Sequence, residues 1–170
     1  MDLSRAYREY YRSLVRFLYR RIGDQARAED LAQEAFVRAL EHRPEKPRAW
    51  LFTVAANLAR DEGRRGAVRR RHLTLLKAEA RARPPEPGPE VAFERRQRIE
   101  KVRRALDDLS ERDREALLLW EEGFDYDEIA GVLGLSRGSI GTTLARARRR
   151  LAAAIEKIED EEGDEDVAHP

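Results

Sequence analysis

Apolar residues recur every three or four positions along most of the chain, which is the spacing of amphipathic helices. One such segment covers residues 3–21 and stops near Gly23, and a second covers residues 26–40. A third, residues 48–65, follows the segment 42–47, whose two prolines disfavour helix. No segment alternates with the period of a strand. The pattern therefore predicts an all-α protein.

A composition break divides the chain. Residues 83–89, RPPEPGP, contain four prolines and a glycine, which is typical of a linker. We expect an N-terminal helical domain at 1–72, a linker at 73–92 and a C-terminal domain at 93–155. The fold class expected is two small helical bundles joined by a Pro-rich linker. The acidic residues 156–170 are predicted to be a disordered tail.

The segment 124–151 predicts two helices joined by a tight turn. Asp125 and Glu128 have the spacing of a capping box, Gly134 suits the left-handed residue that ends a helix, and Ser136 can cap the next helix. The second helix combines an apolar stripe with several arginines. This is the pattern of a helix-turn-helix whose second helix enters the major groove of DNA. A helical hairpin with solvated arginines is the alternative.

Charge is distributed unevenly. The formal net charge is only +1, but the last 15 residues hold eight acidic side chains and one lysine, so the body of the chain is basic. There is no cysteine, and the three histidines lie far apart, so we expect no disulfide, no metal and no cofactor. No nucleophile and base stand at a recognisable spacing, and an enzyme is not expected.

The helix predicted at 26–40 has two faces. Its inner face is expected to hold Leu31, Ala35, Ala39 and Leu40, with Phe36 beside it. Asp30, Gln33, Glu34 and Val37 fall together on a second face, which is acidic and polar within a basic domain. A solvated helix face is one interpretation, and a docking surface for a basic partner is the other.

Two separate stretches resemble one known family. AEDLAQEAFVRAL and WLFTVAANLARDEGRR, followed after the linker by LSERDREALLLWEEGFDYDEIAGVLGLSRGSIGTTLARARRRL, look like a bacterial sigma factor of the extracytoplasmic-function class. The resemblance covers nearly all of residues 5–152 and leaves out the acidic tail. It is specific because both blocks occur in order at domain spacing.

The resemblance implies a subunit that binds core RNA polymerase, directs it to promoters and helps to melt the DNA. By this analogy, Asp30, Gln33 and Glu34 dock on the clamp helices of the largest catalytic subunit. The residues expected to engage the minus-10 element are Trp50, Asn57, Asp61, Arg64 and Arg65, beside the loop 42–47. Those expected to read the minus-35 element are Arg137, Ser139, Thr142, Arg146 and Arg149. Gly141 and Thr143 stand where the family usually has basic residues.

Other interpretations remain open at this stage. A stand-alone helix-turn-helix regulator would bind a duplex site as a dimer without polymerase. The family commonly pairs with an anti-sigma protein, so we expect such a partner besides polymerase and promoter DNA. No apolar run approaches the length of a membrane span, and a cytoplasmic protein is expected.

Overall fold

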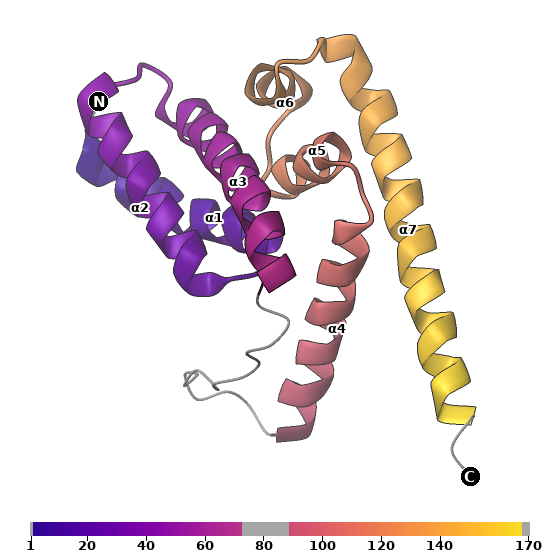
Figure 1. Cartoon of the computed structure of the whole chain (residues 1–170). Coiled ribbons are helices and arrows are strands. Elements are labelled where there is room, and N and C mark those ends of the chain that lie inside the picture. The colour runs from indigo at the N-terminus through magenta and orange to yellow at the C-terminus, as the bar shows by residue number, and fades with distance from the viewer. Residues whose placement is uncertain (1, 73–88, 168–170) are drawn as a thin grey trace.

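The computed structural model describes the backbone of residues 2–72 and 89–167 and the side chains of residues 2–64 and 93–163. These ranges contain seven helices and no strand, which confirms the all-α prediction (Figure 1). The helices are α1 (Leu3–Ile22), α2 (Gln25–His42), α3 (Pro47–His72), α4 (Pro89–Asp107), α5 (Glu111–Glu121), α6 (Tyr126–Leu133) and α7 (Arg137–Val167). Within the described residues, no helix is long and apolar enough to cross a membrane.

Local capping sets most of these boundaries. Gly23 ends α1 with φ 76°, a conformation that costs glycine little because it has no Cβ. The Asp24 carboxylate then accepts a hydrogen bond from the Arg27 N–H, 3.0 Å away, and starts α2. The Ser110 hydroxyl accepts from the Asp113 N–H in the same way and starts α5. The prediction that the first helix stops near Gly23 is confirmed.

Helices α1, α2 and α3 form the first bundle. Leu31, Ala35 and Ala39 of α2 are buried as predicted, and Phe36 is buried beside them. The prediction for Leu40 was wrong, since its side chain is 54% exposed. Leu40 follows Ala39 directly and is therefore turned by roughly 100° away from the buried face.

Helix α7 is one continuous helix to Val167, so the predicted domain boundary at 155 and the predicted disorder of the tail were wrong for residues 156–167. Ala154 and Ile158 are buried against Ala105 of α4 and form a small core of their own. Lys101 of α4 also pairs with Glu162 at 3.0 Å. The apolar spacing of α7 thus continues into the acidic segment, and α4 and α7 lie side by side (Figure 1).

The predicted linker, residues 73–92, extends too far at its C-terminal end. Residues 89–92 belong to α4, which begins at Pro89, a residue favoured at the first position of a helix because it has no N–H to leave unpaired. The rest of the predicted linker, residues 73–88, lies outside the described residues. Residues 168–170 of the predicted tail lie outside them too.

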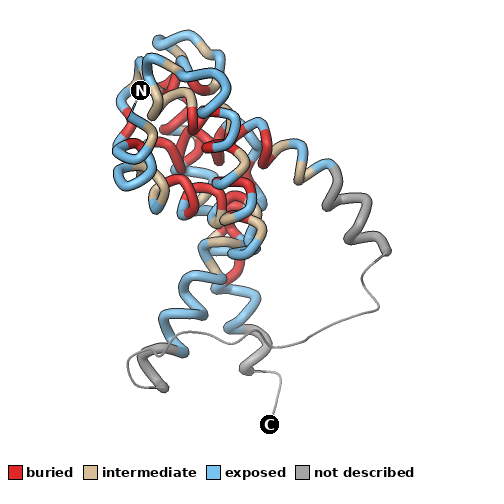
Figure 2. The backbone as a smooth tube through the Cα atoms, turned by 90° about the vertical axis from the view of Figure 1, so that its left-hand side faces the viewer, coloured by how far each residue is buried: buried red, intermediate tan, exposed pale blue. Residues whose placement is uncertain are grey.

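The two bundles share one hydrophobic core (Figure 2). The Phe52 ring of α3 contacts Phe17 of α1 and Phe124 of the C-terminal bundle, with ring centroids 5.4 and 4.7 Å apart. All three rings are almost completely buried. Burial of a phenylalanine side chain contributes about 1.5–3 kcal/mol, so Phe124 is an anchor between the bundles.

Candidate functional surfaces

The acidic face of α2 points away from the core. Asp30 is 65% exposed, Glu34 is 42% exposed and Gln33 is exposed as well, while the opposite face of α2 is buried. Arg27 and Arg38 lie on the same helix and pair with Asp30 and Glu34. Exposed carboxylates held by flexible arginines remain available to a basic partner.

Two exposed apolar side chains continue this face. Val37 is 56% exposed and lies one turn after Glu34, and Leu40 lies one turn further on. Apolar side chains next to polar ones are typical of the surface that a protein partner covers. Helical spacing predicts Val37 beside the acidic residues, whereas Leu40 was expected in the core.

Helix α3 presents a polar face opposite its buried one. One side of α3 carries Trp50, Asn57, Asp61 and Arg64. The last three follow Trp50 by 7, 11 and 14 residues, which are close to whole numbers of helical turns. Asn57, Asp61 and Arg64 are exposed, and Trp50 is partly buried with its ring 5.5 Å from that of His42. The structure therefore brings four of the five predicted minus-10 residues onto one surface. The Arg65 side chain lies outside the described residues.

The turn between α6 and α7 has the predicted helix-turn-helix geometry. Asp125 and Glu128 form both hydrogen bonds of a capping box, at 2.8 and 2.9 Å. Gly134 ends α6 with φ 65°, and the Leu135 N–H donates to the Ala130 carbonyl across the turn. The predicted cap at Ser136 stays a prediction.

The first turns of α7 expose arginine and hydroxyl side chains on one side of the helix. Ile140, Leu144 and Ala147 are completely buried, so the opposite side of the helix faces outward. The predicted residues Arg137, Thr142 and Arg149 are exposed, and Ser139 is half-buried. Thr143 is only 3% exposed, and a Cβ added at Gly141 would lie 3.7 Å from the Tyr126 ring. Thr143, which stands where the family usually has a basic residue, is therefore turned toward the interior of the protein.

Arg146 makes an internal contact that its sequence position did not reveal. Its guanidinium donates from Nε and Nη2 to the carboxylate of Asp113 on α5, which is completely buried. Arg150 donates to the same carboxylate at 3.1 Å. Hydrogen bonds from Arg146 hold the pKa of Asp113 below its ordinary value. This cluster fixes α7 against α5.

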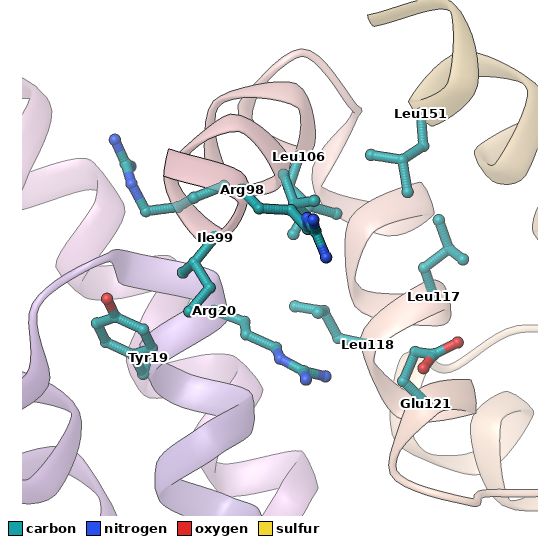
Figure 3. A pocket seen from close by; sticks show the side chains of 11 residues that line it. Tyr19, Arg20, Arg98, Ile99, Leu106, Leu117, Leu118, Glu121 and Leu151 are labelled. Atoms are coloured by element: carbon teal, nitrogen blue, oxygen red, sulfur yellow. The ribbon is translucent and has the colours of Figure 1, made fainter. Parts of the chain in front are cut away.

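A groove of about 380 Å³ opens between the two bundles (Figure 3). Its floor is apolar and includes Ile99, Leu106 and Leu118, and arginine side chains such as Arg20 lie along its edge. No cluster of three or more potential metal ligands occurs in the described part of the chain. The groove lacks the convergent acid, base and nucleophile of a hydrolytic site among its lining residues.

Comparison with known proteins decides the family. Residues 6–72 match Sigma-70 region 2, and residues 99–151 match Sigma-70 region 4. The chain is 33% identical over 162 residues to the RNA polymerase sigma factor YlaC of Bacillus subtilis, with 92% of this chain and 93% of YlaC covered. The chain belongs to the extracytoplasmic-function class of sigma-70 family factors.

Other relatives support this membership. The sigma factor is 35% identical over 150 residues to the extracytoplasmic-function factor EcfG of Rhodopseudomonas palustris, with 84% of this chain and 79% of EcfG covered. Its fold matches that of the sigma factor RpoE of Bartonella quintana, solved in complex with the anti-sigma factor NepR. That match has a TM-score of 0.66 and 24% identity and covers 91% of this chain and 97% of RpoE.

Each of the helix surfaces described above falls within one of the two matched family regions. Region 2 contains α1–α3, with the acidic face of α2 and the polar face of α3. Region 4 contains the helix-turn-helix and the Asp113 cluster. The region 4 match ends at Leu151, so the buried Ala154 and Ile158 belong to a helical extension beyond it.

Proposed function

We propose that this sigma factor binds core RNA polymerase through the acidic face of α2 and brings it to promoters. The docking site on polymerase would be the clamp helices of the largest catalytic subunit. The observation that carries the proposal is the outward orientation of Asp30, Gln33 and Glu34 within the region 2 segment. An exposed acidic face with adjoining apolar side chains suits a basic helical partner.

Helix α3 would engage the minus-10 element and assist melting. A base that leaves the duplex is held by stacking and by hydrogen bonds to its edges. The polar face of α3 offers an aromatic ring at Trp50, an amide at Asn57 and charges at Asp61 and Arg64. Arg65 is proposed to contribute from the following position.

Helix α7 would read the minus-35 element as duplex. The exposed Arg137, Thr142 and Arg149 and the half-buried Ser139 supply hydrogen-bond donors that suit base edges and phosphates. We assign Arg146 to positioning, because its guanidinium is already engaged by Asp113. We propose Arg137, near the start of α7, as the base contact, since its one ion pair among the described residues, with Asp127 at 3.0 Å, is solvent-facing and is worth little.

Run-off transcription tests the whole proposal. Purified core polymerase and this protein are incubated with a pool of genomic fragments, and transcripts are sequenced. Discrete start sites that share two upstream elements are expected. If the protein instead bound a symmetric duplex site as a dimer and gave no transcripts, it would be a stand-alone regulator.

An anti-sigma protein is a further proposed partner. The fold neighbour RpoE of Bartonella quintana was solved with the anti-sigma factor NepR. A partner of that kind would cover the polymerase-binding surface, and its addition should abolish the run-off transcripts.

A further inference from the structure

One ion pair joins the two helices of the helix-turn-helix at their starts. The Asp127 carboxylate, in the first turn of α6, lies 3.0 Å from Nε of Arg137, the first residue of α7. The side chains are 73% and 68% exposed, so the pair belongs to the outer surface of the motif. Because solvent screens it, such a pair adds little to the stability of the fold. Its main effect is on the orientation of the Arg137 side chain.

Asp127 is not needed to begin α6. The cap of this helix is made by Asp125 and Glu128, which form both hydrogen bonds of the capping box, and Asp127 takes part in neither. A carboxylate in the first turn complements the helix dipole, but Asp125 and Glu128 already place two negative charges at this end of α6. Helix formation alone therefore does not account for an acidic side chain at position 127.

A carboxylate at this place weakens the attraction to DNA. In a helix-turn-helix, the first helix crosses the DNA backbone and residues at the start of the second helix contact base edges. The duplex carries one negative charge for about every 1.7 Å of its axis, so a carboxylate beside it raises the energy of every complex. Within the described chain, the other carboxylate that pairs with a predicted minus-35 residue is Asp113, which is completely buried. Asp127 is thus exposed where a surface built only for attraction to DNA has no negative charge.

The geometry of the pair leaves one edge of the Arg137 guanidinium free. A guanidinium holds its N–H donors in one rigid plane. Asp127 lies against Nε, so Nη1 and Nη2 at the end of the side chain remain for two parallel hydrogen bonds. An arginine binds guanine in this bidentate way, through O6 and N7 in the major groove. An unrestrained arginine gives up rotamer freedom to make the contact, and a carboxylate fixed on α6 removes part of that loss beforehand.

We propose that Asp127 is a positioning residue for base reading, which holds Arg137 in the orientation that binds guanine. The inference rests on the proposed function, since it assumes that the start of α7 reads the minus-35 element. Asp127 itself touches no base. It lowers the affinity for all duplex DNA and raises the preference for guanine at one position, so that specificity increases while affinity decreases. Adenine presents a donor where guanine presents O6, and a guanidinium fixed in this way therefore rejects it.

The test measures base discrimination by the full-length protein bound to core polymerase. A promoter found by run-off transcription is prepared with every single base-pair change across its minus-35 element, and the affinity of the complex for each duplex is measured. The ratio of the affinities for the unchanged and the changed duplex is the discrimination at that position. Arg137→Ala should lower it by at least roughly fivefold at one guanine, which identifies the contacted base pair. Asp127→Ala should lower the discrimination at the same guanine by at least roughly threefold.

The affinity for duplex DNA without the element should change in the opposite direction. Asp127→Ala removes a negative charge beside the backbone, so it should bind such DNA roughly twofold more tightly at low salt, and the gain should shrink as salt is added. Local unfolding would instead lower both the affinity and the discrimination. Asp127→Glu keeps the carboxylate and should keep more of the discrimination than Asp127→Ala does. Asp108→Ala is the matched control, because Asp108 is an exposed carboxylate of the same bundle outside the helix-turn-helix, and it should leave the discrimination unchanged.

A double-variant cycle shows whether Asp127 acts through Arg137. In the Arg137→Ala background, Asp127→Ala should leave the discrimination unchanged, because no guanidinium remains to be held. A loss of discrimination in that background would overturn the positioning role and make Asp127 a base contact itself, as an acceptor for cytosine. An equal change of affinity for every sequence, with either Asp127→Ala or Arg137→Ala, would overturn it as well.

Two controls keep this inference separate from the proposed function. Circular dichroism checks that each variant is helical. Run-off transcripts that persist when the positioning role is overturned leave the proposed function standing. Their absence with the unmodified protein refutes the function and this inference with it.

Discussion

Asp113→Ala is the substitution for which the structure sets the clearest expectation. It removes a completely buried carboxylate that Arg146 and Arg150 share. Loss of one partner of a fully buried pair costs about 3–5 kcal/mol, because the other charge is left without water. The two arginines here are 42% and 55% exposed and regain water, so we expect a smaller loss of about 2 kcal/mol in the free energy of unfolding.

Thermal unfolding followed by circular dichroism measures this loss. For a chain of this size, 2 kcal/mol lowers Tm by about 4–8 °C. The matched control is Glu34→Ala, which removes one side of an exposed arginine pair on α2 and should change the free energy of unfolding by less than about 1 kcal/mol. Equal effects of the two substitutions would refute the reasoning about Asp113.

The pH dependence of the same pair gives a second readout. Arg146 lowers the pKa of Asp113 in the folded protein, so the carboxylate stabilises the fold above the pKa of the unfolded chain, about 3.9. This stabilisation is lost as the pH falls through the lower, folded value. The stability difference between the unmodified protein and Asp113→Ala should therefore be full at pH 7 and shrink below about pH 4. A difference that stays constant down to pH 2 would contradict the assignment.

Three further substitutions test other parts of the account. Arg137→Ala should weaken binding most at promoters with a guanine at the contacted position, by about 1–3 kcal/mol, and an equal loss for every sequence in a binding series would indicate a phosphate contact instead. Ile158→Ala should lower the free energy of unfolding by about 1–3 kcal/mol, whereas a disordered tail would show no change on chemical denaturation. Gly23→Ala should cost about 1–2 kcal/mol, since Gly23 has φ 76° and Arg103 lies 3.1 Å from the added Cβ; an unchanged Tm would contradict this.

The local features of the fold could be predicted because each is written within a few residues. The cap at Asp125 needs only Glu128, and the end of α6 needs only Gly134. The outward face of α2 followed from helical spacing alone. Leu40 shows the limit of that reasoning, because one residue of rotation separates a buried from an exposed position.

The contacts between distant segments could not be predicted from spacing. Arg146 has a side chain typical of a DNA contact, and nothing nearby in sequence indicates that Asp113, 33 residues earlier, holds it. Phe52 and Phe124 are likewise ordinary core residues of two separate helical patterns, and only the structure places their rings together. The helical tail differs, because Ala154 and Ile158 continue the apolar stripe of α7, whereas the high charge of the segment predicts disorder.

Polymerase binding by the acidic face of α2 is the central claim, and one measurement tests it most directly. The affinity of purified core polymerase for the unmodified protein is compared with that for the variant Asp30→Lys, Gln33→Lys, Glu34→Lys. Because all three positions are solvent-facing, the variant should keep its helical content and its Tm within a few degrees. We predict at least a roughly hundredfold loss of affinity, since like charges then meet at the interface. Unchanged affinity in the folded variant would contradict the account.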